Sequence, residues 1–257
     1  MTVWDPALYN RYKAYRERPA LDLLLRLPQD LEPRDIWDLG CGAGEQAAVL
    51  KLRHPETRVR GLDSSVEMLA EARQRTADVE WIQGDIAAFA ADTPPDLIFT
   101  NAALQWLPDH EELVPRLVRT LAPAGVFACQ MPESYDTSWH KLLRETAEDG
   151  PWADRLAGVR GVRPVAPAEA YYDMVAPLCG EVDIWSTVYL HVLEGDDPVV
   201  EWMQGTGLRP YLQALSVAEE RIAFLDAYRA RIAAAFPSRA DGTTLFPFPR
   251  LFILARR

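Results

Sequence analysis

Cysteine is scarce in this chain, and positive charge is outnumbered by negative charge. Three cysteines, Cys41, Cys129 and Cys179, occur among 257 residues without the spacing of metal ligands, so a disulfide framework is not expected and reduced thiols are. Lysine and arginine together number 27 against 38 acidic residues, which gives a net charge of −11. A basic face that neutralises phosphates is therefore not expected, and nucleic acid is not an expected partner.

Histidine clusters and long apolar runs are also missing. The four histidines, at positions 54, 110, 140 and 191, show no metal-like pairing, so no bound metal is predicted. No apolar run is long enough to span a bilayer, and the N-terminus has no apolar signal core. We expect a cytoplasmic protein without membrane contact. Self-association is left open, with a monomer as the working expectation.

The chain is organised around residues 35–44, which read DIWDLGCGAG. Ile36, Trp37 and Leu39 form a short apolar run that is typical of a strand. Three glycines then allow a sharp turn and a close approach to a ligand, because they carry no Cβ. An alanine-rich helical stretch follows at residues 45–53. The order strand, glycine turn and helix is typical of a nucleotide-type site in a doubly wound α/β sheet.

The spacing of the glycines argues against a dinucleotide. The dinucleotide pattern is G-x-G-x-x-G, but here the third glycine comes one residue early and Glu45 occupies its place. An acidic side chain there would repel a pyrophosphate, and a second acid, Asp38, precedes the glycines. Both acids favour a ligand with positive charge and no phosphate, such as S-adenosylmethionine. An NAD-dependent oxidoreductase is discounted for the same reason.

The segment D-L-G-C-G-A-G, residues 38–44, closely resembles the first motif of class I S-adenosylmethionine-dependent methyltransferases. A second strand at residues 58–62 ends at Asp63, about 20 residues further on, where an acid can accept hydrogen bonds from ribose hydroxyls. Asp63 could instead cap the helix over residues 65–75, although Ser64 or Ser65 could also do so. Met68 faces either the adenine or the core.

Two further loops carry expected cofactor contacts. Gly84-Asp85-Ile86 follows a third strand, residues 79–83, and the resemblance implies that Asp85 accepts from the adenine amino group with the Ile86 backbone nearby. The alternative for Asp85 is a plain turn former. The resemblance also implies that the mouth of a fourth strand, residues 95–101, faces the methyl group. The expected cofactor contacts are Asp38, Gly40, Cys41, Gly42, Asp63, Ser64, Met68, Asp85, Ile86, Asn101 and Tyr12.

The first half of the chain alternates between strands and helices. Asp109 and Glu112 resemble an acidic capping box before an amphipathic helix, which is followed by a fifth strand at residues 126–131. We expect an α/β fold: a Rossmann-like, doubly wound, mostly parallel seven-stranded sheet with a helical cap inserted in its second half. The whole chain, 1–257, is expected to form a single domain.

The second half is expected to supply the cap, at about residues 135–180 and 195–240, and two more strands. Those strands are expected at 182–192 and around 251–254. Ser216 and Glu219 suggest a capping box for a long helix. The expected buried face of this helix comprises Ile222, Leu225, Tyr228, Ile232 and Ala235. Residues 1–20, rich in aromatics, are expected to form either a lid over the cofactor, with Tyr12 in contact, or a solvated helix.

Several motifs extend the resemblance to nearly the whole chain. W-D-P-A-L-Y at residues 4–9, R-x-R-P at 16–19, N-A-A-L-Q-W at 101–106 and E-W-M-Q-G-T-G-L-R-P-Y-L at 201–212 together resemble the trans-aconitate 2-methyltransferase family. The resemblance implies esterification of one carboxylate of trans-aconitate, with S-adenosylmethionine as methyl donor and S-adenosylhomocysteine as product. A small carboxylic acid is thus the expected substrate.

This chemistry needs no general base, because a carboxylate is already ionised near neutral pH. We therefore predict positioning alone and no catalytic residue. Guanidinium groups bind carboxylates well, so Arg209 in the glycine-flanked segment is the first substrate candidate and Arg11 a weaker one. The other candidates are Gln105, Trp106, Tyr171 and Tyr211.

Each substrate candidate has an ordinary alternative. A tyrosine or tryptophan can simply pack in the core, and Arg209 can form a surface ion pair. For the whole chain, the alternatives are a methyltransferase acting on another small metabolite and a non-catalytic module that binds S-adenosylmethionine.

Overall fold

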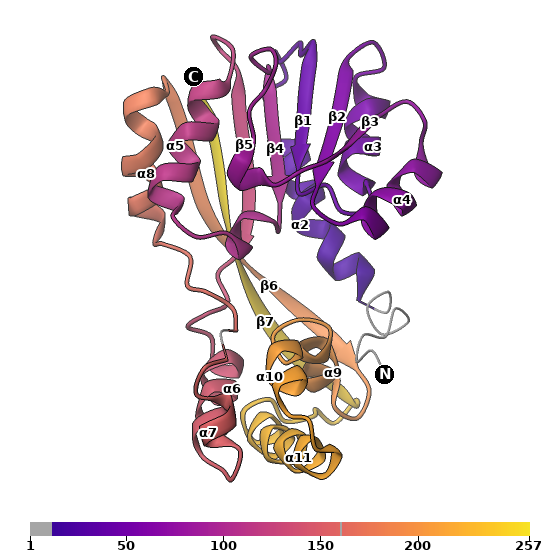
Figure 1. Ribbon diagram of the computed structural model, residues 1–257, viewed down its shortest axis with the longest axis vertical. Coiled ribbons are helices and arrows are strands. Elements are labelled where there is room, and N and C mark those ends of the chain that lie inside the picture. Colours follow the sequence, from indigo (N-terminus) through magenta and orange to yellow (C-terminus); the bar gives the residue numbers. More distant parts are fainter. Residues whose placement is uncertain (1–11, 160) are drawn as a thin grey trace. The chain divides into compact units, whose positions relative to one another are not determined.

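The computed structural model describes residues 12–159 and 161–257, which fall into two compact units (Figure 1). The sheet unit comprises Pro19–Pro132, Ala166–Thr187 and Arg250–Arg257. The helical unit comprises the described residues before Pro19, together with Glu133–Val165 and Val188–Pro249. The motif at residues 4–9, the candidate Arg11 and much of the expected N-terminal lid lie outside the described residues.

The sheet has seven strands in the order β3-β2-β1-β4-β5-β7-β6, which confirms the predicted fold class. Its strands are β1 (Asp35–Leu39), β2 (Arg58–Asp63), β3 (Glu80–Gln83), β4 (Leu97–Asn101), β5 (Val126–Pro132), β6 (Glu181–Glu194) and β7 (Thr243–Arg256). β1 to β5 pair in parallel, and β7 pairs antiparallel with β5. The order changes direction between β1 and β4, which is where ligands bind in open α/β sheets.

Helices cover both faces of the sheet. Those of the sheet unit are α3 (Glu45–Arg53), α4 (Val66–Arg75), α5 (His110–Thr120) and α8 (Ala168–Val175), and α2 (Lys13–Arg26) crosses from one unit to the other. The crossovers from β1 to β3 and from β4 to β5 run in opposite directions. Because such crossovers are right-handed, α3 and α4 lie on one face and α5 on the other (Figure 1).

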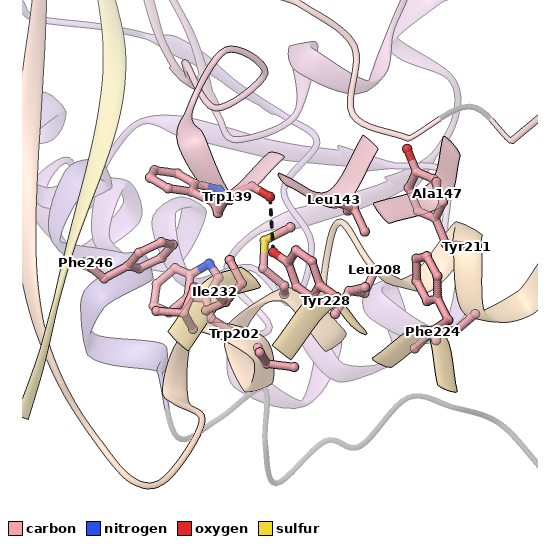
Figure 2. Close-up of a cluster of buried hydrophobic side chains, with 14 of the residues drawn as sticks. Trp139, Leu143, Ala147, Trp202, Leu208, Tyr211, Phe224, Tyr228, Ile232 and Phe246 are labelled. Atoms are coloured by element: carbon pink, nitrogen blue, oxygen red, sulfur yellow. Dashed lines mark hydrogen bonds between the residues drawn. The ribbon is translucent and has the colours of Figure 1, made fainter. Parts of the chain in front are cut away.

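The helical unit is built around aromatic side chains (Figure 2). Its helices are α6 (Ser138–Glu148), α7 (Ala153–Leu156), α9 (Pro198–Gln204), α10 (Arg209–Ala214) and α11 (Ala218–Ala235). Trp139 lies 4.5 Å from Phe246 between ring centroids, and the Tyr228 hydroxyl donates to the Trp139 carbonyl oxygen at 3.2 Å. This unit therefore has a buried core of its own.

Neither predicted capping box forms. Asp109 stands at the N-cap of α5 with φ 57°, and its side chain makes no capping hydrogen bond, because a side-chain cap requires an extended N-cap backbone. The N-cap of α11 is Val217, so the helix begins one residue later than the predicted box requires, and Ser216 precedes the cap. Favourable acids in the first turn remain in both helices.

The buried face of α11 agrees only in part with the prediction: Tyr228 and Ile232 are buried as expected. Phe224, Tyr228 and Ile232 are the buried residues of this helix, whereas Ile222 is 60% exposed and Ala235 is exposed. Phe224, which is absent from the predicted face, is therefore part of the buried face, and Leu225 is half-buried. A second difference concerns residues 166–180, which we expected in the cap: α8 groups with the sheet unit.

A buried ion pair joins Asp35, the first residue of β1, to Arg60, the third residue of β2. Arg60 of β2 is 2% exposed; it lies over the Trp37 ring at 4.0 Å and hydrogen-bonds to Asp35 through two guanidinium nitrogens. It also pairs with Asp92 at 2.5 Å, which lowers the pKa of Asp92 to about 2. This cluster connects β1 and β2 at the edge opposite to the glycine turn.

Replacing Arg60 by leucine should destabilise the fold by about 3–5 kcal/mol, because Asp35 would remain buried without its partner. The measurement is urea unfolding near neutral pH. Arg58→Leu is the matched control: Arg58 lies in the same strand and pairs with Glu80 at 2.9 Å, but both side chains are about half exposed. The control should cost at most about 1 kcal/mol. Equal losses in the two variants would contradict this assignment.

Candidate functional site

The glycine turn follows β1 and is held against the end of β2. The backbone N–H groups of Gly40 and Cys41 both donate to the Leu62 carbonyl oxygen, at 2.8 and 3.1 Å. Gly40 and Gly44 have φ of 75° and 82°, and a Cβ on either would collide with Ala103 or Trp81 respectively. These two glycines are therefore required by packing within the chain.

Gly42 differs from its neighbours, because no atom of the described residues lies within 4 Å of the position that its Cβ would occupy. Its φ is 53°, and its N–H donates to the Asp63 carboxylate at 2.8 Å. The turn is thus open at Gly42, where a ligand can approach the backbone.

Asp63 holds the turn through backbone hydrogen bonds. One carboxylate oxygen accepts from Gly42 and the other from the Ser65 N–H at 2.9 Å. The N-cap of α4 is Ser65, whose hydroxyl accepts from the Met68 N–H at 3.2 Å, so Asp63 is not needed for that role. Each carboxylate oxygen of Asp63 keeps a further lone pair for a ligand hydroxyl. Ser64 is exposed and Met68 half-buried nearby in the sequence.

Asp38 carries the buried acidic charge of the site. It is 1% exposed, and its Oδ2 has no hydrogen-bond partner among the described residues. Burial raises the pKa of Asp38 to about 7, although a hydrogen bond from the Ala47 backbone opposes the shift. A buried carboxylate oxygen without a partner is costly, and a cation bound beside it would lower that cost.

Glu45, which we expected to give the turn an acidic character, forms an ion pair within the chain. Its carboxylate pairs with Arg75 of α4 at 2.8 Å, and Arg75 also donates to the Ala43 carbonyl oxygen. The guanidinium group of Arg75 therefore compensates the negative charge of Glu45 within the protein. The acidic character of the turn depends on Asp38 instead. Cys41 is buried, and burial raises the pKa of its thiol, which stays protonated.

The loop after β3 contains Asp85 and Ile86. Asp85 is exposed, and its Oδ1 accepts from the Ala87 N–H at 2.8 Å. One carboxylate oxygen therefore stabilises the turn, which was the alternative role that we gave for Asp85. Ile86 is buried. Arg116 of α5 fixes this loop by donating to the carbonyl oxygens of Phe89 and Ala87, both at 2.7 Å. Sequence reasoning missed Arg116, because its partners lie almost 30 residues away and no local pattern links them.

Three of the predicted cofactor and substrate contacts, Asn101, Gln105 and Trp106, lie at or just after the end of β4. Asn101 ends the strand, and its Oδ1 is buried without a partner among the described residues. Gln105 is 6% exposed; its Nε2 donates to the Ala102 carbonyl oxygen at 2.6 Å, while its Oε1 is likewise unpartnered. Trp106 is 57% exposed. The polar side chains at this edge therefore have hydrogen-bonding capacity that the described chain does not use.

The remaining candidates lie elsewhere. Arg209 begins α10 in the helical unit and is exposed, with no acidic partner among the described residues. Tyr211 is buried and stacks on Phe224 at 6.2 Å, and burial raises its pKa. Tyr12 is also in the helical unit, buried against Trp202 at 5.1 Å with its hydroxyl donating to Glu201 at 3.1 Å. Its packing is that of a core residue.

The structure contradicts the prediction that Tyr171 contacts the substrate. Its side chain is fully buried between α8 and α5, and its hydroxyl lies 2.6 Å from Nδ1 of His110. His110 in turn bonds the Leu104 carbonyl oxygen through Nε2 at 2.8 Å. Because this chain of hydrogen bonds uses the Tyr171 hydroxyl within the protein, Tyr171 is not a substrate contact.

Comparisons with known proteins agree with this geometry. A methyltransferase-domain family matches residues 36–125, which include β1, the glycine turn, Asp63, Asp85 and β4. Trans-aconitate 2-methyltransferase of Azoarcus sp. (strain BH72) is 51% identical over all of this chain and all of its own length. The protein of the same name from Acidovorax ebreus is 49% identical over all of this chain and 99% of its own.

The chain belongs to the trans-aconitate 2-methyltransferase family. The resemblance seen in the sequence is thereby confirmed, and so is the class of enzyme, a methyltransferase. Among solved structures, the YcgJ protein of Bacillus subtilis has the same fold, with a TM-score of 0.60 and 17% identity over 93% of this chain and 98% of its own. No helix among the described residues is long and apolar enough to cross a membrane.

Asp38→Asn tests the charge of the site. Because a bound cation favours the ionised form, cofactor affinity of the wild-type chain should fall about tenfold per pH unit below the Asp38 pKa of about 7. Asp38→Asn should bind the cofactor more weakly at pH 8 and show a flat profile. Calorimetric titration with S-adenosylmethionine between pH 5 and 8 measures both.

The same raised pKa has a consequence for stability. Protonated Asp38 stabilises the ligand-free fold fully at pH values below the ordinary aspartate pKa of 3.8, and this contribution is lost as the pH rises through about 7. Ligand-free Asp38→Asn should therefore be more stable than wild type at pH 8. A variant that loses stability and cofactor affinity together would show that Asp38 is structural.

Gly42→Ala and Gly44→Ala form a second, matched pair. Both positions have positive φ, but only at Gly44 does a Cβ collide with Trp81. Gly44→Ala should therefore lower the melting temperature more than Gly42→Ala. Gly42→Ala should keep the fold and weaken cofactor binding, since the new methyl group enters the open side of the turn. Thermal melts and titration of the two variants decide this; the reverse order of effects would contradict the assignment.

Proposed function

We propose that this chain transfers the methyl group of S-adenosylmethionine to one carboxylate of trans-aconitate and releases the monomethyl ester and S-adenosylhomocysteine. The observation that carries the choice of substrate is the 51% identity, over the full length of both chains, with a protein named trans-aconitate 2-methyltransferase. The observations that support the cofactor are the buried Oδ2 of Asp38, which has no partner among the described residues, and the open backbone at Gly42.

The residues of the sheet unit fit a cationic adenosyl ligand. Asp38 supplies the negative charge for a cation, and the open backbone at Gly42 allows close approach. Asp63 has lone pairs left for the ribose hydroxyls, and Asp85 has a second oxygen left for the adenine amino group. When bound, S-adenosylmethionine supplies an electrophilic methyl group on its sulfonium sulfur. The chain's task is then to hold an acceptor oxygen in line with that group.

The acceptor needs no deprotonation, because carboxylic acids are ionised at neutral pH. One carboxylate oxygen forms the new bond to the methyl carbon, the bond from carbon to sulfur breaks, and its electron pair stays on sulfur. Charge is neutralised in this step, so removal of water from the site favours it. Orientation of the acid is thus the main requirement on the substrate side.

Arg209 is the proposed anchor for a carboxylate that does not react. Its exposed guanidinium has no acid partner among the described residues, and the glycines at 205 and 207 precede it. A guanidinium group binds a carboxylate with two parallel hydrogen bonds, which fixes the orientation of the acid. Trp106 and Gln105 at the mouth of β4, and Tyr211, complete the proposed substrate contacts.

The wider organisation is also proposed. The helical unit would act as the substrate cap, residues 1–20 as a lid, and the whole chain as one functional domain. We further propose that the protein works as a monomer in the cytoplasm, where its three cysteines stay reduced. Sedimentation of the purified chain tests the monomer directly.

The proposed activity is tested with the purified chain, S-adenosylmethionine labelled in the methyl group and a panel of acids. Trans-aconitate should give a base-labile methyl ester with the highest kcat/KM of the panel. Labelling of a phenol or an amine, with none of any di- or tricarboxylate, would overturn the proposal and favour another small metabolite. Absence of turnover with every acceptor would favour a binding module without catalysis.

Arg209→Ala should raise KM for trans-aconitate by about 10- to 100-fold, because a charge-assisted contact is lost, and leave cofactor affinity nearly unchanged. Arg239→Ala is the control, since Arg239 is another exposed arginine of the helical unit. The control should behave as wild type. Equal loss of acid and cofactor binding in Arg209→Ala would mean that Arg209 is structural.

A further inference from the structure

Gln130 of β5 is a buried carboxamide without a hydrogen-bond partner. Its side chain is 1% exposed, and neither Oε1 nor Nε2 bonds to any described residue. A buried amide in this state lowers stability, and buried polar groups in folded proteins are normally paired. A methionine or leucine would fill the same space without this cost. The carboxamide therefore requires an explanation outside the ligand-free chain.

The register of the sheet places Gln130 on the same face as the cofactor-binding acids. Gln130 is paired with Asn101 of β4, Asp38 of β1 is paired with Phe99, and Gly61 of β2 is paired with Asp38. Because side chains alternate along a strand and paired residues share a face, Asp63, Asp38, Asn101 and Gln130 all lie on one face. They follow one another on the neighbouring strands β2, β1, β4 and β5.

The backbone around Gln130 belongs to the mouth of β4. Its carbonyl oxygen accepts from the N–H of Ala102 at 2.9 Å, and Ala102 has φ 52°, an unusual conformation for a residue other than glycine. Asn101 and Gln105, on either side of Ala102, also carry buried unpartnered amide oxygens. Three carboxamides with unused hydrogen-bonding atoms thus gather where β4 and β5 end.

The position of Gln130 along the sheet indicates which ligand it meets. The expected adenosine contacts, Asp63 and Asp85, belong to β2 and the loop after β3, on one side of the point between β1 and β4 where the strand order changes direction. Gln130 lies on β5, on the other side. A ligand whose adenosine end lies over β2 and β3 has its methyl acceptor toward β4 and β5, and under the proposed function that acceptor is a carboxylate.

We propose that Gln130 is a substrate-binding residue that donates a hydrogen bond from Nε2 to the methyl-accepting carboxylate. This inference rests on the proposed function. A neutral amide orients the acid through one oxygen and leaves the charge of the carboxylate largely uncompensated. An arginine at this buried position would stabilise the free carboxylate more than the transition state, in which that charge is being lost. The carboxamide therefore fits a nucleophile better than a cation does.

Gln130→Met tests the assignment, because methionine is similar in length and makes no such hydrogen bond. KM for trans-aconitate should rise by about 10- to 100-fold and kcat should fall, while the affinity for S-adenosylhomocysteine changes less than about threefold. The melting temperature of the ligand-free variant should equal or exceed that of wild type, since an unpaired buried amide has been removed.

Thr100→Val is the matched control. Thr100 is fully buried in β4, and its hydroxyl has no partner in the described part of the chain, but it pairs with Cys129 and so lies on the opposite face of the sheet. This variant also removes an unpaired polar atom from the same region, and its KM and kcat should equal those of wild type. Should Gln130→Met fail to fold, Gln130→Asn keeps the amide but shortens it, and should show the same selective rise in KM.

The outcomes separate the inference from the function on which it rests. Wild-type turnover of trans-aconitate together with wild-type KM and kcat in Gln130→Met would overturn the inference alone. Acid and cofactor affinities that fall by the same factor would also overturn it, since Gln130 would then be structural. Absence of ester from wild type with every acid of the panel would overturn the proposed function and, with it, the carboxylate assigned to Gln130.

Discussion

The hydrogen bonds that Asp63 accepts from Gly42 and Ser65 connect the two loops on which the site depends. One carboxylate at the end of β2 fixes the glycine turn after β1 and the start of α4. The Leu62 carbonyl oxygen strengthens this link by accepting from Gly40 and Cys41. Because Asp63 holds the open backbone of Gly42 in place, a ligand meets a turn that is already ordered, and little conformational entropy remains to be lost on binding.

The distribution of charged side chains around the glycine turn favours a ligand that carries a positive charge. Glu45 is neutralised by Arg75, and Arg60 is enclosed by Asp35 and Asp92 at the opposite edge of the sheet. Asp38 alone combines deep burial, a raised pKa and an oxygen without a partner in the described chain. Asp38 is thus the acid that we expect beside a cationic ligand. The proposed acid substrate requires positively charged side chains instead, such as Arg209, in a chain whose net charge is −11.

The sheet was predictable because its signals are local: apolar runs such as Leu97-Ile98-Phe99 and the glycines after Leu39 identify β4 and the turn without tertiary information. Features that depend on residues far away in the sequence could not be predicted. Arg116 is bound to a loop nearly 30 residues away, Tyr171 is bound to His110, and the Glu45 pair depends on Arg75 in the next helix. Gln130 becomes informative only once the register with Asn101 is known.

The central claim is that the glycine turn binds a phosphate-free cation. Calorimetric titration of the purified wild-type chain, first with S-adenosylmethionine and then with NAD, tests it most directly. The account predicts saturable one-to-one binding of S-adenosylmethionine and no detectable heat with NAD at the same concentrations. Tight binding of NAD, with none of S-adenosylmethionine, would contradict it.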